Sequence, residues 1–377
     1  MALKKMIDRT KPDYALLLIT MILVSLGLLM IYSASAFIAD ANYHNSTHFF
    51  QKQLIWILLS LPFLLVFMRL DYHKLGHLST LLLLLSLALL VAVLFFPAFK
   101  GVKRWIRMGP MGFQPTEVFK YSLILFLSFS LAKQKERVKK FKHVFPYFLI
   151  LLVASVLIIQ EPHLGSIFSL WIIFMVMIFV AGGRIRHLLV LTLPFVLIGG
   201  IMVFGLGYEK DRMDSYLRAV EKPLDGDYQT KQSVLTLGSG GLRGTGLGEG
   251  KQKLFYLPEP HTDFIFASIG EEGGFVALFG ISLLFLLFGL RGLKSALKAP
   301  DIAGFLLACG ITSAVMVGFL INTMVVVGVL PTTGIPLPFL SYGGSSLLVT
   351  LAGVGVLLNI SKQRAYERKR YRRIARP

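Results

Sequence analysis

Apolar runs of roughly 20 residues recur along the whole of this sequence, and a run of that length crosses about 30 Å of hydrocarbon as an α-helix. Strands of a membrane β-barrel would instead alternate polar and apolar residues over about ten positions. The chain is 55% hydrophobic and 16% charged, which is more apolar than a soluble protein of this size. The sequence therefore predicts an all-α polytopic membrane protein.

Ten membrane-spanning helices are predicted in one domain covering residues 1–377. They are expected at residues 14–37, 51–68, 78–96, 115–132, 144–160, 165–181, 188–207, 264–290, 302–327 and 342–360. The first is too long for a signal-peptide core, so we expect it to be retained. Basic residues gather before it, at 133–142 and in the tail 361–377, which predicts that both termini are cytoplasmic. The net charge of +19 is then explained by topology and anionic lipid headgroups, and nucleic-acid binding is not expected.

Two basic segments on the predicted outer side break this charge rule. The first, residues 100–114, carries Lys100, Lys103, Arg104 and Arg107 beside Trp105. It is either a recess for an anionic group or an interfacial loop with an aromatic anchor.

The second is the external loop at about 208–262, with the glycine-rich centre LGSGGLRGTGLGEGKQK. It matches neither nucleotide-binding glycine pattern, so no nucleotide is expected. It is either a mobile loop or a backbone that approaches a substrate phosphate, with Arg243, Lys251 and Lys253 nearby.

Charged residues inside predicted spans indicate either function or helix packing. Glu117 and Lys120 are one helical turn apart, so they share a face and can pair. Glu271 and Glu272 are adjacent, so at least one should point into the bundle.

Metal and disulfide chemistry have little support in the sequence. The pairs His44/His48 and His73/His77 have i, i+4 spacing without a third ligand. The only cysteine, Cys309, lies in an apolar run, so no disulfide forms within the chain.

Several separated motifs, in order, resemble those of the SEDS family of bacterial cell-wall polymerases. They are RWIRMGPMGFQPTE from Arg104, QEPHLG from Gln160, Gln232 and Ser233 before the glycine-rich loop, YLPEPHTDFIFA from Tyr256, and NTMVVVGVLPTTGIPLPFLSYGGSS from Asn322. The run before the catalytic motif is most similar to division-type (FtsW) and sporulation-type (SpoVE) members, rather than the elongation type (RodA). The family commonly has Pro-Asp-Leu-Gly where this chain has His163, and Gly273 replaces a larger apolar residue.

The resemblance implies a ten-helix glycosyltransferase in the bacterial cytoplasmic membrane. It would polymerise lipid II at the outer face, for septal synthesis, with a class B penicillin-binding protein and other divisome membrane proteins. Asp263 is then the catalytic residue and general base, although a carboxylate there could instead be a helix cap. The other predicted substrate contacts are Lys100, Lys103, Arg104, Trp105, Arg107, Glu117, Lys120, Gln232, Ser233, Lys251, His261, Thr262 and Ser341. A divalent cation, Mg²⁺ or Mn²⁺, could share the charge compensation, whereas no haem is expected.

Two other function classes stay open: a flippase for the same lipid-linked precursor, and a scaffold for the penicillin-binding protein. We expect the partner's membrane helix to pack on residues 264–290 and 302–327. Small residues favour close helix contact there, although packing within the chain explains them equally well. They are Gly274, Gly280, Gly304, Gly310 and Gly318.

Overall fold

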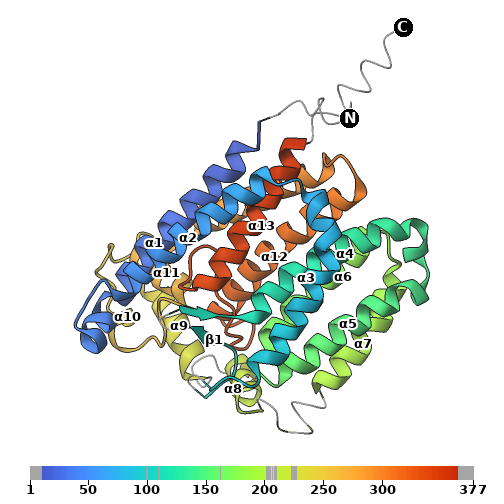
Figure 1. Ribbon diagram of the computed structural model, residues 1–377. Helices are drawn as coiled ribbons and strands as arrows, with labels where there is room; N and C mark the ends of the chain where they lie inside the picture. The colour runs from blue at the N-terminus through green and yellow to red at the C-terminus, as the bar shows by residue number, and fades with distance from the viewer. Residues whose placement is uncertain are drawn as a thin grey trace.

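The computed structural model describes residues 11–98, 101–108, 111–161, 163–200, 205, 207, 210–221 and 227–363. Most of them form helices gathered in one bundle (Figure 1). Seven helices are long and apolar enough to cross a membrane: α1 (Tyr14–Tyr43), α2 (His48–Arg69), α3 (Tyr72–Val93), α5 (Phe141–Ile159), α11 (Ile265–Leu297), α12 (Ile302–Val326) and α13 (Gly344–Gln363). The predicted helical, multi-pass architecture is therefore confirmed.

Three further helices coincide with the remaining predicted spans: α4 (Pro115–Gln134), α6 (Leu164–Val180) and α7 (Ile185–Gly200). A short 3-10 helix, η2 (Lys135–Lys139), joins α4 to α5. Each predicted span therefore contains a helix, while ten membrane crossings stay a prediction. The start of α1 meets the end of α13, where the Asp13 N–H donates to Ser361 Oγ at 3.0 Å.

The helices α12 and α13 form the centre of the bundle (Figure 1). In their most apolar stretches 72% and 78% of residues are buried, against 22% in α2 and α11. Close packing uses glycines: a Cβ at Gly353 would lie 2.6 Å from the Tyr121 ring of α4. Many exposed residues are large and apolar, among them Leu189 and Leu193 of α7, as a lipid-facing surface requires.

The two basic segments contain more structure than the expected loops. The first forms an antiparallel hairpin of β1 (Ile106–Met108) and β2 (Met111–Phe113), with Arg107 paired to Gly112. The second contains α8 (Lys210–Glu221), α9 (Tyr228–Ser239) and α10 (Gln252–Phe255). Contacts between α9 and both α11 and α12 agree with a segment folded over the bundle.

The glycine-rich loop fills a break in α11, so it is not a free loop. Gly274 has φ 65° and ψ −167°, which interrupts the helix at an angle that suits glycine. The Thr245 N–H donates to Glu271 O at 2.9 Å and the Phe275 N–H donates to Gly241 O at 2.9 Å. The loop therefore satisfies backbone groups that the break leaves open.

Side-chain contacts also join the glycine-rich loop to α11. Lys253 is ion-paired with Glu272, and it donates to Ser33 Oγ of α1 at 2.9 Å. Glu271 accepts from the Gln252 N–H at 2.8 Å. Both glutamates are buried, in line with the prediction that at least one points inward. The suggestion that Lys253 is available to a phosphate is wrong, because its side chain is 2% exposed and paired.

Candidate active site

The segment before α11 is fixed by the loop between α12 and α13. Asn322 Nδ2 donates to Asp263 O at 2.7 Å and to Ile335 O at 2.9 Å. Ser341 Oγ donates to Thr262 O at 2.6 Å, and the Tyr342 N–H donates to His261 O at 2.9 Å. His261 also packs against the Phe49 ring at 4.4 Å. The backbone around Asp263 is therefore held by hydrogen bonds from Asn322 of α12 and from Ser341 and Tyr342 of the loop that follows α12.

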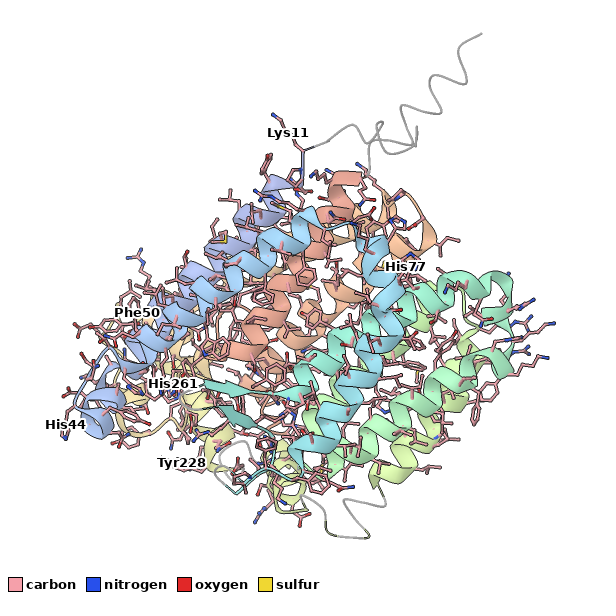
Figure 2. The ribbon with its side chains drawn as sticks, viewed as in Figure 1. Lys11, His44, Phe50, His77, Tyr228 and His261 are labelled. Carbon is pink, nitrogen blue, oxygen red and sulfur yellow. The ribbon has the colours of Figure 1, made fainter. Side chains whose placement is uncertain are left out.

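Figure 2 places this segment within the bundle. His261 lies toward the end that α1 reaches at His44, and Lys11 lies at the opposite end. The helix cap of α11 is Phe264 rather than Thr262 or Asp263, and it makes no side-chain cap bond. Asp263 lies one residue before this cap.

Three polar side chains from distant parts of the sequence meet around Gly334. A Cβ on Gly334 would lie 3.5 Å from His163 Nε2, 3.6 Å from Arg104 Nη1 and 3.7 Å from Asp263 Oδ2. These are ordinary van der Waals distances, but Gly334 has φ +70°, an angle that disfavours any side chain there. We call Arg104, His163 and Asp263 the Gly334 cluster. It brings one anion and one cation to a single turn, an arrangement suited to proton transfer beside an anionic group.

Sequence reasoning missed Glu161, which lies beside this cluster. Arg104 Nε donates to the Glu161 carbonyl at 2.9 Å, and Thr116 Oγ1 donates to Glu161 Oε2 at 3.0 Å. The side chain is fully buried, and Oε1 has no hydrogen-bond partner in the described part of the chain. Burial raises the pKa of Glu161 to about 7, against the opposing effects of Thr116 and Arg104. A carboxyl in the turn between two apolar spans was the signal available in the sequence.

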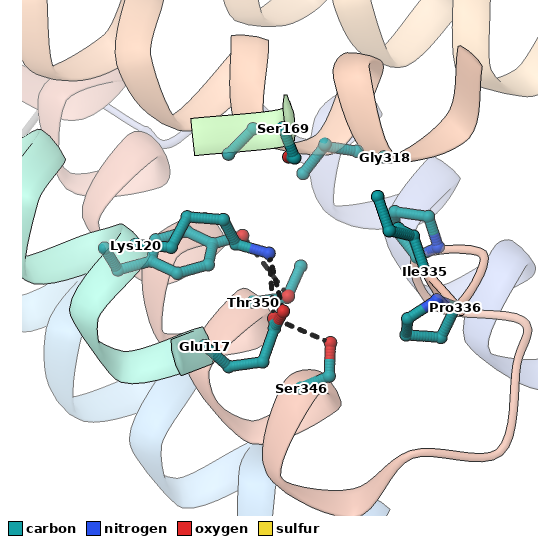
Figure 3. A pocket seen from close by; sticks show the side chains of 12 residues that line it. Glu117, Lys120, Ser169, Gly318, Ile335, Pro336, Ser346 and Thr350 are labelled. Atoms are coloured by element: carbon teal, nitrogen blue, oxygen red, sulfur yellow. Dashed lines mark hydrogen bonds and ion pairs between the residues drawn. The ribbon is translucent and has the colours of Figure 1, made fainter. Parts of the chain in front are cut away.

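Glu117 and Lys120 form the predicted ion pair, with Lys120 Nζ 2.8 Å from Glu117 Oε2. Ser346 Oγ of α13 donates to the same oxygen at 2.9 Å. The pair lines a small cavity of about 20 Å³ (Figure 3). Ile335 and Pro336 also line it, so the cavity borders the loop that carries Gly334.

Only part of the first basic segment reaches the Gly334 cluster. Arg104 does, whereas Lys103 Nζ donates to Leu94 O at 3.0 Å. Trp105 packs against Gly112 across the hairpin, and Arg107 is exposed. Lys100 lies outside the described residues.

Among the other predicted contacts, Ser233 and Thr262 have partners within the chain. Ser233 Oγ donates to Val326 O at 2.8 Å, which ties α9 to α12. Gln232 lies one residue earlier and is partly buried, while Lys251 is exposed next to the loop that covers α11. Thr262 Oγ1 donates to Glu259 O at 3.1 Å. Substrate contacts by these residues stay predictions.

An apolar groove opens beside the cluster. It has a volume of about 220 Å³ and lies between α6, α8 and the loop after α12. Phe168, Met213 and Leu330 supply apolar walls, and Arg212 supplies a cation. Thr333 also lines the groove. We call the backbone from Thr333 to Ile335 the Gly334 turn, and the groove is continuous with it.

No group of three or more His, Cys, Asp or Glu side chains in the described part of the chain could hold a metal ion. The Gly334 cluster offers one carboxylate, so a divalent cation there would need substrate oxygens as further ligands.

Comparison with known proteins gives one consistent result. The sequence model of the FtsW, RodA and SpoVE family, described as "Cell cycle protein", matches residues 14–366. The chain is 41% identical to a probable peptidoglycan glycosyltransferase FtsW of Geobacter metallireducens, over 93% of this chain and 94% of that one. It is 42% identical to stage V sporulation protein E of Bacillus subtilis, over 95% and 99%.

Solved structures agree. A chain from a peptidoglycan synthase complex, solved to study structural coordination of polymerization and crosslinking, has a TM-score of 0.77 and 28% identity over 94% of this chain and 98% of that one. Rod shape determining protein RodA of Thermus thermophilus has a TM-score of 0.68 and 27% identity, covering 94% and 97%. With the family match across nearly the whole chain and relatives above 40% identity, the protein belongs to the FtsW, RodA and SpoVE family.

Proposed function

We propose that this protein is a peptidoglycan glycosyltransferase that polymerises lipid II at the outer face of the bacterial cytoplasmic membrane. The observation that carries the proposal is the Gly334 cluster, which brings Asp263 and Arg104 together. It occurs in a chain that is 41% identical to a probable peptidoglycan glycosyltransferase.

The proposed reaction is a single displacement. Asp263 takes the proton from the acceptor sugar hydroxyl as its oxygen forms a bond to the anomeric carbon of the donor. The bond from that carbon to the diphosphate oxygen breaks, and the diphosphate leaves with the electron pair. Attack on an α-linked donor gives a β-linked glycan by inversion. Arg104 stabilises the growing negative charge.

The apolar groove suits the lipid part of the donor. Its walls are mainly apolar and it continues to the Gly334 turn. We place the first isoprene units between Phe168 and Leu330, with Arg212 near the diphosphate. This placement puts the charged end of the lipid beside Arg104 and the anomeric carbon near Asp263.

The proposed topology has ten crossings, with both termini cytoplasmic and the hairpin and α8–α10 outside. The meeting of the ends of α1 and α13 supports it. Cysteines introduced singly at Lys103 and Arg243, in a Cys309→Ser background, should react with an impermeant thiol reagent in spheroplasts. Protection of both until lysis would contradict the topology.

The proposed partner is a class B penicillin-binding protein of the divisome. Four of the five glycines suggested for its docking are occupied within the chain: Gly274 by the glycine-rich loop, Gly304 by Tyr72, Gly310 by Ile124 and Gly318 by Pro338. Gly280 has open space around it and lies beside the exposed Phe279 of α11. The proposed contact therefore narrows to this outer stripe of α11, which cysteine crosslinking in membranes can test.

A sporulation role is the second candidate, because the chain is 42% identical to the sporulation relative and 41% identical to the FtsW relative. Depletion distinguishes the two in the source cell. Filamentous growth supports septal synthesis, whereas normal division with failed spore cortex supports the sporulation role.

The decisive test is polymerisation of lipid II by purified protein, with and without the partner, read as glycan length on a gel. Asp263→Asn keeps the side-chain size but cannot take the proton, so we expect a loss of at least about 100-fold in rate. Normal expression and partner binding are the controls for folding. Polymerisation within about tenfold of wild type would contradict the assignment, because that loss is below the usual range for a general base.

A further inference from the structure

His163 stands at the junction of α6 and the Gly334 turn. It is the residue that precedes α6, yet its side chain makes no cap bond to that helix. The imidazole is 4% exposed. Its ring nitrogens instead contact Ser166 Oγ and Gly334 O.

These contacts determine where the imidazole carries its hydrogen. His163 Nε2 lies 3.3 Å from Gly334 O, and a carbonyl only accepts, so the hydrogen is on Nε2. The Nδ1 atom of a neutral ring then accepts from the Ser166 hydroxyl. Burial and Arg104 lower the pKa of His163 to about 3, with Gly334 and Glu117 opposing and Arg212 adding to the effect. The ring is therefore neutral at any working pH.

The Gly334 turn is held from two directions. On one side Asn322 binds Ile335 O, which joins the turn to the Asp263 segment. On the other side are the His163 hydrogen bond and the close contact of Gly165 with Thr333. His163 thus links the start of α6 to the Gly334 turn by a hydrogen bond. Arg104 and Asp263 both approach that turn.

We propose that His163 is a positioning residue, whose neutral Nε2–H holds the Gly334 carbonyl and thereby fixes the turn that the Arg104 guanidinium and the Asp263 carboxylate both approach. This inference rests on the proposed function of Asp263. A carboxylate at position 163 could not donate to Gly334 O, and it would add a second negative charge next to Asp263. The histidine supplies a donor without that charge.

An isosteric pair of variants tests the proposal. His163→Gln keeps a neutral amide donor at the same number of bonds from Cβ as Nε2, whereas His163→Glu has the same shape but carries a charge. We expect the Gln variant to polymerise lipid II within about threefold of wild type with the same pH profile, since its amide can still donate to Gly334 O. We expect the Glu variant to lose about tenfold at pH 7, and its acid limb to move up by about one pH unit, because a nearby like charge raises the pKa of Asp263.

The outcomes separate three possibilities. A loss above about 100-fold in the Gln variant, with none recovered at higher pH, would mean that His163 itself transfers a proton. Equal rates and equal pH profiles for wild type and the Glu variant would mean that it positions nothing. Either result overturns the proposal.

A second readout does not depend on catalysis. Hydrogen–deuterium exchange of the peptide covering residues 330–343 should be several-fold faster in His163→Ala than in wild type, and near wild type in His163→Gln. Unchanged exchange in His163→Ala would overturn the positioning role. If the wild type makes no glycan at all, the proposed function fails, while this measurement still decides whether His163 holds the turn.

Discussion

Two lysine–glutamate pairs in this bundle have the same chemistry and opposite surroundings. Lys120 and Glu117 are 16% and 9% exposed and line a cavity, whereas Lys253 and Glu272 are 2% and 0% exposed. The first pair lies within one helix, while the second joins the glycine-rich loop to α11. We therefore expect the sealed pair between two elements to stabilise the fold, and the pair beside the cavity to contact the substrate.

The sealed pair should give the largest effect when it is broken. Lys253→Met leaves the Glu272 carboxylate buried without its cation, which we expect to cost about 3–5 kcal/mol of unfolding free energy. Ser33 Oγ and the Gly248 N–H still donate to Glu272, so the loss should stay within that range. Thermal unfolding in detergent, followed by tryptophan fluorescence, measures it.

A second substitution provides the control for charge. Lys253→Met combined with Glu272→Gln removes both charges and keeps an acceptor for Ser33 and Gly248. At least half of the lost stability should return. A Lys253→Met variant as stable as wild type would show that the pair does not hold the loop on α11.

Glu161 is another buried carboxyl, with a hydroxyl rather than a lysine as its side-chain partner. Its folded-state pKa of about 7 lies above the ordinary value of 4.5. The native state therefore binds the extra proton, and stability should fall as pH rises from 4.5 through about 7. Glu161→Gln removes this dependence, so it should match wild type near pH 5 and exceed it by up to about 3 kcal/mol at pH 8.

Unfolding temperatures of wild type and Glu161→Gln, measured from pH 5 to pH 8, check this sign. Converging curves at low pH are expected. Parallel curves would mean that the carboxyl is already ionised in the folded protein, and hence that Glu161 behaves like the lysine-paired glutamates.

The helices were predictable because lipid imposes one requirement on every span, a long apolar run with internally satisfied backbone bonds. The Glu117–Lys120 pair was predictable for a related reason: residues three apart on a helix share a face. Both inferences use distances along the chain that helical geometry fixes.

The clusters between elements were not predictable from spacing. Lys253 looked available for phosphate because its loop is polar and glycine-rich, yet the break at Gly274 draws that loop onto α11. Arg104 was one of four similar cations, and only tertiary packing selects it for the Gly334 cluster. The resemblance pointed to Asp263, but the contacts of His163 and Glu161 needed coordinates.

Lys120→Met repeats the first substitution in the cavity-lined pair, and we expect a smaller effect on stability. Ser346 Oγ still donates to Glu117 Oε2 at 2.9 Å. The cavity of about 20 Å³ exceeds the roughly 10–15 Å³ that one water needs, so solvent can take over as a partner for the carboxylate. The loss should then be about 1–2 kcal/mol, well below that of Lys253→Met.

If the pair serves the reaction, polymerisation should fall by about tenfold or more while the protein stays folded. Equal destabilisation by the two lysine substitutions would make both pairs structural, and a stable, fully active Lys120→Met protein would remove this pair from the site.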